Sequence, residues 1–125
     1  MNWIYVIIGG GIGALLRYLS TQIVNNFFNN KFIFGTIFVN CIGALLIGFF
    51  INIFETHSIY IKWKLLIITG FLGGYTTFSA YSLETVNYLI NGDIKYALLN
   101  IFLSNVLCIV FVLLGIWLGK IIFIK

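Results

Sequence analysis

Four long apolar runs, separated by short polar connections, dominate the pattern of this chain. The runs cover about residues 3–24, 34–54, 65–90 and 96–122, and the polar connections are residues 25–31, 55–64 and 91–95. A helix needs about 20 apolar residues to cross a bilayer, and each run is long enough. The pattern predicts an all-α integral membrane protein, one domain over residues 1–125, with four transmembrane helices and both termini on one side.

The third run has a polar interruption in its middle. Residues 70–82 (GFLGGYTTFSAYS) contain glycines, threonines and serines but no charge. Glycine and β-branched threonine are weak helix formers, so we expect the third helix to be broken near its middle. A break would free backbone carbonyls between Gly73 and Thr76, which could coordinate a cation at the midplane. Alternatively, or in addition, Gly70, Gly73 and Gly74 let a neighbouring helix pack closely.

Small and polar residues recur at helical spacing in the other runs. Gly9, Gly13 and Arg17 share one face of the first run, and Asn40 opens a similar face in the second. Arg17 either anchors the structure or contacts an ion, and Asn40 either holds two helices together or donates hydrogen bonds to a ligand. The sequence leaves both questions open. The fourth run has its own polar stripe, formed by Asn100, Ser104 and Cys108.

The composition narrows the classes of protein. Hydrophobic residues make up 62% of the 125 residues and charged residues only 8%, whereas soluble domains have about 25% charged residues. A net charge of +4, dispersed along the chain, does not indicate a nucleic-acid partner. Cys41 and Cys108 lie in apolar runs without a CxxC spacing and are typical of core residues. No nucleophile with its base, metal-ligand cluster or phosphate loop is apparent, so we expect no enzyme.

Lysine and arginine are nearly balanced across the predicted membrane. The side of the termini carries four of them, Lys62, Lys64, Lys120 and Lys125. The opposite side carries Lys31 and Lys95, and Arg17 reaches toward it. The orientation of a membrane protein follows the asymmetry of these charges. Because the asymmetry is weak here, the chain can insert in both orientations. We therefore expect a dual-topology antiparallel homodimer with its two-fold axis in the membrane plane.

Three motifs resemble the Fluc (CrcB-type) fluoride channel family, and the resemblance extends from end to end. They are residues 9–18 (GGGIGALLRY), 35–43 (GTIFVNCIG) and 70–79 (GFLGGYTTFS), of which the last is highly specific. The resemblance implies a dual-topology homodimer in the cell inner (plasma) membrane, with two fluoride pathways and a structural sodium ion. The implied function is passive, selective export of fluoride, which lowers cytoplasmic fluoride.

The resemblance also implies roles for individual residues. The backbone carbonyls of Gly73 and Thr76, from both subunits, would hold the sodium ion. Asn40 would be an amide donor in the pathway, and Arg17 a positive residue near its entrance.

Two aromatic residues would line the fluoride pathway with their ring edges, Phe78 and Tyr81. The family usually has phenylalanine at the second position, so the Tyr81 hydroxyl is a departure that could donate to fluoride or narrow the path. A dry pathway for a strongly hydrated anion needs donors that replace water. The hydroxyls that could serve are those of Thr77, Ser79, Ser82 and Ser104.

Two other functions fit the size of the chain. A small four-helix multidrug exporter needs a titratable carboxylate deep in its first helix, where this chain has Arg17 and no acid. An accessory subunit of a membrane complex would explain the glycine faces but not the hydroxyl-rich break. A liposome assay separates these functions, because an exporter needs a proton gradient and an accessory subunit passes nothing.

Overall fold

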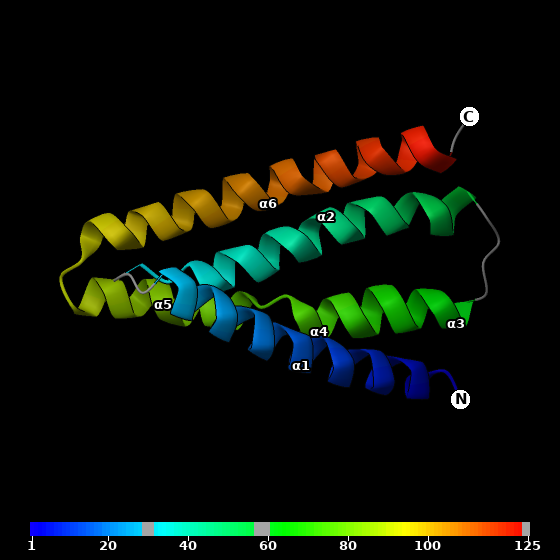
Figure 1. Cartoon of the computed structure of the whole chain (residues 1–125), viewed down its shortest axis with the longest axis horizontal. Helices are drawn as coiled ribbons and strands as arrows, with labels where there is room; N and C mark the ends of the chain where they lie inside the picture. The colour runs from blue at the N-terminus through cyan, green and yellow to red at the C-terminus, as the bar shows by residue number, and fades with distance from the viewer. Residues whose placement is uncertain (29–31, 57–60, 124–125) are drawn as a thin grey trace.

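The protein is a bundle of helices. The computed structural model describes residues 1–28, 32–56 and 61–123, and every regular element in these ranges is helical. Lys31 and Lys125 lie outside the described residues. The helices are α1 (Trp3–Phe28), α2 (Phe34–Thr56), α3 (Ile61–Lys64), the π-helix η1 (Leu65–Leu72), α4 (Gly73–Tyr75), α5 (Phe78–Ile90) and α6 (Ile94–Phe123). Figure 1 shows an elongated bundle in which α1 begins and α6 ends at the same end.

The predicted break in the third run is confirmed. Lys64 and Leu72 have helical dihedral angles, so α3, η1 and α4 follow one another without interruption. Thr76 and Thr77 are extended, and α5 begins at Phe78. Figure 1 shows the pieces on either side of the break running along α2. Because the run is divided, only α1, α2 and α6 are, among the described helices, long and apolar enough to cross a membrane on their own.

Several helix ends differ from the sequence prediction. Helix α1 continues to Phe28, into the predicted connection at residues 25–31, and Asn25 Oδ1 there accepts a hydrogen bond from the Gly35 amide (2.8 Å). Residues 61–64 are also helical because they lead directly into η1. Helix α6 begins at Ile94, and the predicted turn before it contains Gly92 with a φ of 76°.

Close helix packing depends on glycines at two contacts. A Cβ atom on Gly13 of α1 would lie 2.1 Å from the Phe71 carbonyl oxygen, and one on Gly74 would lie 2.5 Å from the Gly10 carbonyl oxygen. Between α2 and α6, a Cβ atom on Gly115 would lie 2.1 Å from the Leu45 carbonyl oxygen. The prediction that bare faces let backbones approach is therefore confirmed.

Gly73 is different from its neighbours. The nearest atom to a Cβ built there is the Ile68 carbonyl oxygen at 4.0 Å, whereas Cβ atoms on Gly70 and Gly74 would both clash with α1. Close packing therefore explains Gly70 and Gly74 but not Gly73.

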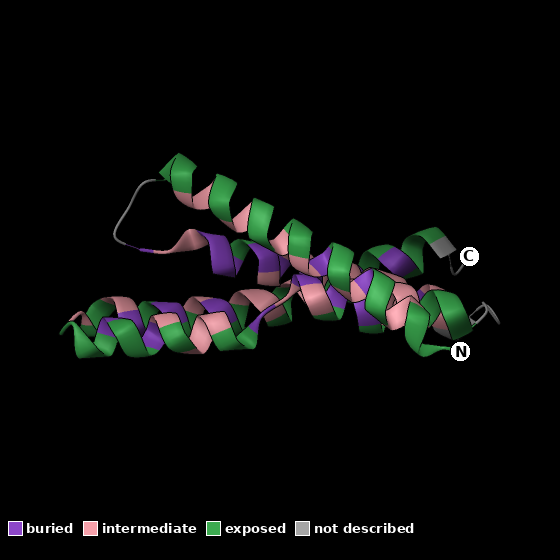
Figure 2. Ribbon diagram, turned by 90° about the horizontal axis from the view of Figure 1, so that it is seen from below, coloured by how far each residue is buried: buried purple, intermediate pink, exposed green. Residues whose placement is uncertain are grey.

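Apolar side chains cover the outside of the bundle. Figure 2 shows exposed positions along the whole of α1 and much of α6, with the buried positions between the helices. Ile7, Phe102 and Ile109 each expose more than 60% of their surface. A soluble protein rarely exposes so continuous an apolar surface to water. In a multi-pass membrane protein the surrounding lipid covers this surface.

Candidate functional site

The break between α4 and α5 is the centre of the candidate site. Thr76 has φ −85° and ψ 157°, and Thr77 has φ −150° and ψ 115°. The Thr76 hydroxyl donates to the Leu72 carbonyl (2.9 Å), and the Thr77 hydroxyl accepts from the Ala80 amide (3.2 Å) as the N-cap of α5. Both threonines thus bond locally in ways that compete with a continuous helix.

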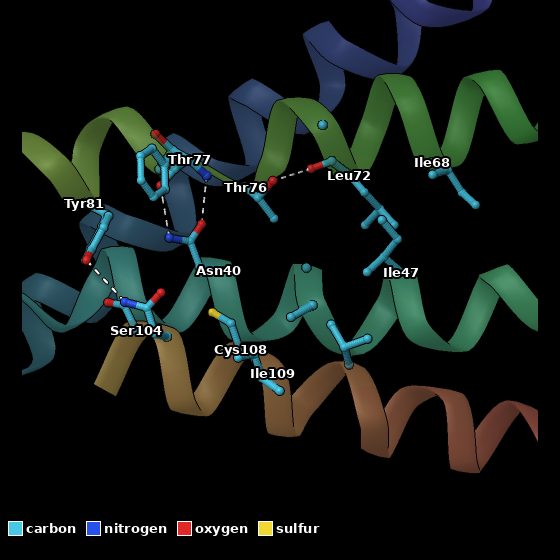
Figure 3. Close-up of a pocket in the computed structure, with 16 residues that line it drawn as sticks. Asn40, Ile47, Ile68, Leu72, Thr76, Thr77, Tyr81, Ser104, Cys108 and Ile109 are labelled. Carbon is cyan, nitrogen blue, oxygen red and sulfur yellow. Dashed lines mark hydrogen bonds between the residues drawn. The ribbon is translucent and has the colours of Figure 1, made fainter. Parts of the chain in front are cut away.

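Asn40 of α2 holds the break open. Its Oδ1 accepts from the Thr77 amide (2.7 Å) and its Nδ2 donates to the Thr77 carbonyl (3.0 Å) (Figure 3). In a continuous helix the Thr77 amide would donate to the Gly73 carbonyl. The side chain therefore satisfies both backbone groups of Thr77 and deprives Gly73 of its helical donor, which is the helix-joining role considered for Asn40.

Arg17 reaches the same break from α1. Its side chain is half-buried, and Nη1 lies 3.5 Å from the Thr76 carbonyl oxygen. The guanidinium faces the protein interior. Both roles considered for Arg17, structural anchor and ion contact, require this orientation.

A cavity of about 430 Å³ lies on one side of the break, bounded by α2 and α6. Figure 3 shows the side chains that face it, with Asn40 and Tyr81 near the break and Ile47 and Ile68 farther along. None of the described residues that line it is charged. Its lining includes seven of the ten residues expected in the pathway or sodium site, beside apolar residues: Asn40, Gly73, Thr76, Thr77, Phe78, Tyr81 and Ser104.

The two aromatic residues expected in the pathway lie together at this cavity. The ring centroids of Phe78 and Tyr81 are 5.2 Å apart, with the ring planes at 50°. Phe78 exposes 76% of its surface on the isolated chain. The Tyr81 hydroxyl points toward α6, where Asn105 Nδ2 lies 3.3 Å away (Figure 3).

A second cavity, of about 440 Å³, lies against the other part of the break. Arg17 and Ser79, two of the three remaining expected residues, line it together with Thr36 and Glu84. Thr77 lines both cavities, so the extended segment separates them.

Two expected donors are engaged in other ways. Ser82 donates to the Phe78 carbonyl of its own helix (2.9 Å) and lines neither cavity of the single chain. Within the fourth-run stripe, Asn100 is buried and donates to Thr85 Oγ1 (2.9 Å), whereas Ser104 and Cys108 do line the first cavity.

Sequence reasoning missed three residues of this site, Thr36, Glu84 and Asn105. The Thr36 hydroxyl donates to Glu84, and the other carboxylate oxygen of Glu84 is buried with no partner among the described residues. A lone acid inside an apolar run was the available signal for Glu84. Asn105 is one of two asparagines in the fourth run, and nothing in the sequence distinguished it before Tyr81 was placed beside it.

The chain matches a known family over most of its length. The family model described as CrcB-like protein, Camphor Resistance (CrcB), matches residues 4–116.

Curated relatives named fluoride-specific ion channel FluC are similar along nearly the whole chain. The relative from Hydrogenobaculum sp. (strain Y04AAS1) is 46% identical over 121 residues, which cover 95% of this chain and 98% of the relative. The relative from Campylobacter hominis is 44% identical over 115 residues, 91% of each chain. That from Coxiella burnetii is 41% identical over 122 residues, 96% of this chain and 98% of the relative.

Proposed function

This chain belongs to the CrcB-like family, and we propose that it conducts fluoride across a membrane. The proposal follows from the curated relatives, which are similar to it along nearly their whole length and are named fluoride-specific ion channels. Fluoride leaves the cell down its electrochemical gradient, through the cell inner (plasma) membrane, and cytoplasmic fluoride falls. The protein is a channel and not an enzyme.

The observation that carries this proposal is the uncharged cavity beside the break. Its lining offers the Tyr81 hydroxyl, amide groups and the ring edges of Phe78 and Tyr81, while the Ser104 hydroxyl in the same lining donates to Asn100 Oδ1 (3.4 Å). Hydroxyl and amide protons and positive ring edges can replace water around an anion, whereas a cation pathway needs carboxylates or converging carbonyls. Selectivity follows because a larger anion such as chloride does not fit between closely packed rings, whereas fluoride fits and these donors replace its lost water.

An antiparallel second copy completes the pathway in this proposal. Phe78 lines the cavity and exposes 76% of its surface on the single chain, so little of it is covered by the described residues. A copy related by a two-fold axis in the membrane plane would cover Phe78 and create two equivalent pathways. The near balance of lysine and arginine allows both orientations.

Labelling tests the dual topology. Asn91 is exposed in the turn between α5 and α6, so a single Asn91→Cys variant offers a reactive thiol outside the membrane. We expect an impermeant maleimide to label it from both sides of the cell membrane. The unmodified chain is the control, because Cys41 is buried and Cys108 half-buried within the bundle. Labelling from a single side contradicts dual insertion.

The break also fits a structural sodium ion. Gly73 has lost its helical donor to Asn40, and among the described residues the Thr76 carbonyl has only the long Arg17 contact of 3.5 Å. Carbonyl oxygens are ligands that hard cations favour, and two antiparallel copies would supply four of them. In the proposed dimer the ion holds the two breaks together and does not flow with fluoride.

A conservative variant tests whether carbonyls or side chains hold this ion. Thr76→Ser keeps the carbonyl and the hydroxyl that donates to Leu72. We expect its fluoride flux to match the unmodified protein, and flux of both proteins to fall when sodium is exchanged for a bulky organic cation. If the exchange of sodium leaves the fluoride flux of both proteins unchanged, the structural sodium ion is contradicted.

Fluoride efflux from liposomes, followed with a fluoride electrode, tests the function itself. Phe78→Ile removes the positive ring edge and keeps an apolar side chain. Since hydrogen-bond-like contacts to a charged group contribute about 1.5–3 kcal/mol, we expect flux to fall at least about tenfold while the dimer still assembles. Leu89→Ile, at an exposed position on the same helix that lines neither cavity, is the matched control. Full flux in Phe78→Ile places the pathway elsewhere.

A further inference from the structure

Asn105 makes two contacts through one nitrogen atom. Its Nδ2 lies 2.7 Å from the Ile101 carbonyl oxygen and 3.3 Å from the Tyr81 hydroxyl oxygen. A carbonyl oxygen can only accept a hydrogen bond, so the amide atom against Ile101 must be the nitrogen. The Ile101 contact thus fixes which way the Asn105 amide is turned.

This orientation determines the role of the Tyr81 hydroxyl. An amide nitrogen donates two hydrogen bonds and accepts none, so Asn105 donates one to Ile101 and the other to Tyr81. The Tyr81 oxygen is therefore the acceptor in this contact, and its own proton remains for a different acceptor. In the part of the chain that the structure describes, the Asn105 contact is the only hydrogen bond of that hydroxyl.

The acceptor for the Tyr81 hydroxyl proton would lie in the first cavity. Tyr81 and Asn105 both line it, and the Phe78 ring lies 5.2 Å from the Tyr81 ring at its open side. A hydroxyl that already accepts one hydrogen bond is polarised and becomes a stronger donor. An anion in the cavity would therefore meet a polarised O–H donor beside a positive ring edge.

We propose that the Tyr81 hydroxyl is a direct donor to fluoride and that Asn105 is the positioning residue that turns its proton into the cavity. This proposal rests on the proposed function, because it concerns the same pathway. It assigns to this chain a donor that a phenylalanine at position 81 would lack. Asn105 itself does not contact the anion, since both of its N–H groups are already engaged.

A double-mutant cycle measured as fluoride efflux from liposomes tests both roles. We expect Tyr81→Phe, which keeps the ring and removes the donor, to lower flux at least about tenfold, because hydrogen bonds to charged groups are strong. Asn105→Ala should lower flux severalfold in the unmodified protein and leave it unchanged in the Tyr81→Phe background. A residue with a merely structural role would lower flux by the same factor in both backgrounds.

Controls separate the possible failures. Ser82→Ala removes a hydroxyl next to Tyr81 that is bonded to its own helix, and it should keep full flux. If Asn105→Ala does not assemble, Asn105→Leu supplies a side chain of similar volume without the amide.

The outcomes are distinct. Unmodified protein that passes no fluoride overturns the proposed function and this inference with it. Unmodified protein that conducts, with Tyr81→Phe conducting equally well, overturns the donor role alone. If Tyr81→Phe lowers the flux, and Asn105→Ala lowers it by the same factor in both backgrounds, the positioning role of Asn105 alone is overturned.

Discussion

Asn40→Asp is expected to lower fluoride flux at least about tenfold, because a carboxylate cannot donate to the Thr77 carbonyl and repels an approaching anion. In the structure Nδ2 makes that donation at 3.0 Å, and the Thr77 amide is bonded to Oδ1 at 2.7 Å. Aspartate keeps the second bond and loses the first. An unpaired carbonyl away from water costs about 1–3 kcal/mol, so the variant should also unfold at a lower temperature.

Efflux from liposomes and thermal unfolding in detergent measure the two effects of Asn40→Asp. Asn87→Asp makes the same chemical change at an exposed position of α5 and is the matched control. We expect it to leave both flux and unfolding temperature close to those of the unmodified protein. Undiminished flux in Asn40→Asp would show that neither the Thr77 pairing nor the amide donor is needed for conduction.

Gly13→Ala is expected to have the largest effect on stability. The added Cβ atom would lie 2.1 Å from the Phe71 carbonyl oxygen and 2.9 Å from the Tyr75 amide nitrogen, so α1 must move away from η1 and α4. Both contacts are to backbone atoms, which cannot turn aside as a side chain can. Overpacking of this kind costs about 1–3 kcal/mol, and it displaces Arg17, one turn further along α1, from the break.

Gly11→Ala is the control for this prediction. It lies on the same helix, and nothing comes within 4 Å of a Cβ atom built there. Alanine also forms helices better than glycine, so this variant should be as stable as the unmodified protein or slightly more stable. Equal unfolding temperatures for Gly13→Ala and Gly11→Ala would contradict the close approach of α1 to η1.

Local chemistry determined much of this protein before any tertiary contact was considered. The apolar runs set the membrane class because a helix must be long enough to cross lipid. The break in the third run followed from weak helix formers beside β-branched threonines, a property of neighbouring residues. The motifs around Gly13, Asn40 and Thr77 were sufficient to recognise the family.

The partners of the site's polar groups were decided by the tertiary structure alone. Thr77 pairs with Asn40, which is 37 positions away in the sequence, and Glu84 accepts from Thr36, which is 48 positions away. Which residues meet across such distances depends on the rotation and register of packed helices, and the periodicity of one helix does not specify these for its neighbour. For the same reason, the roles of Gly73 and Gly74 could be separated, and Asn105 found beside Tyr81, only after the helices were in place.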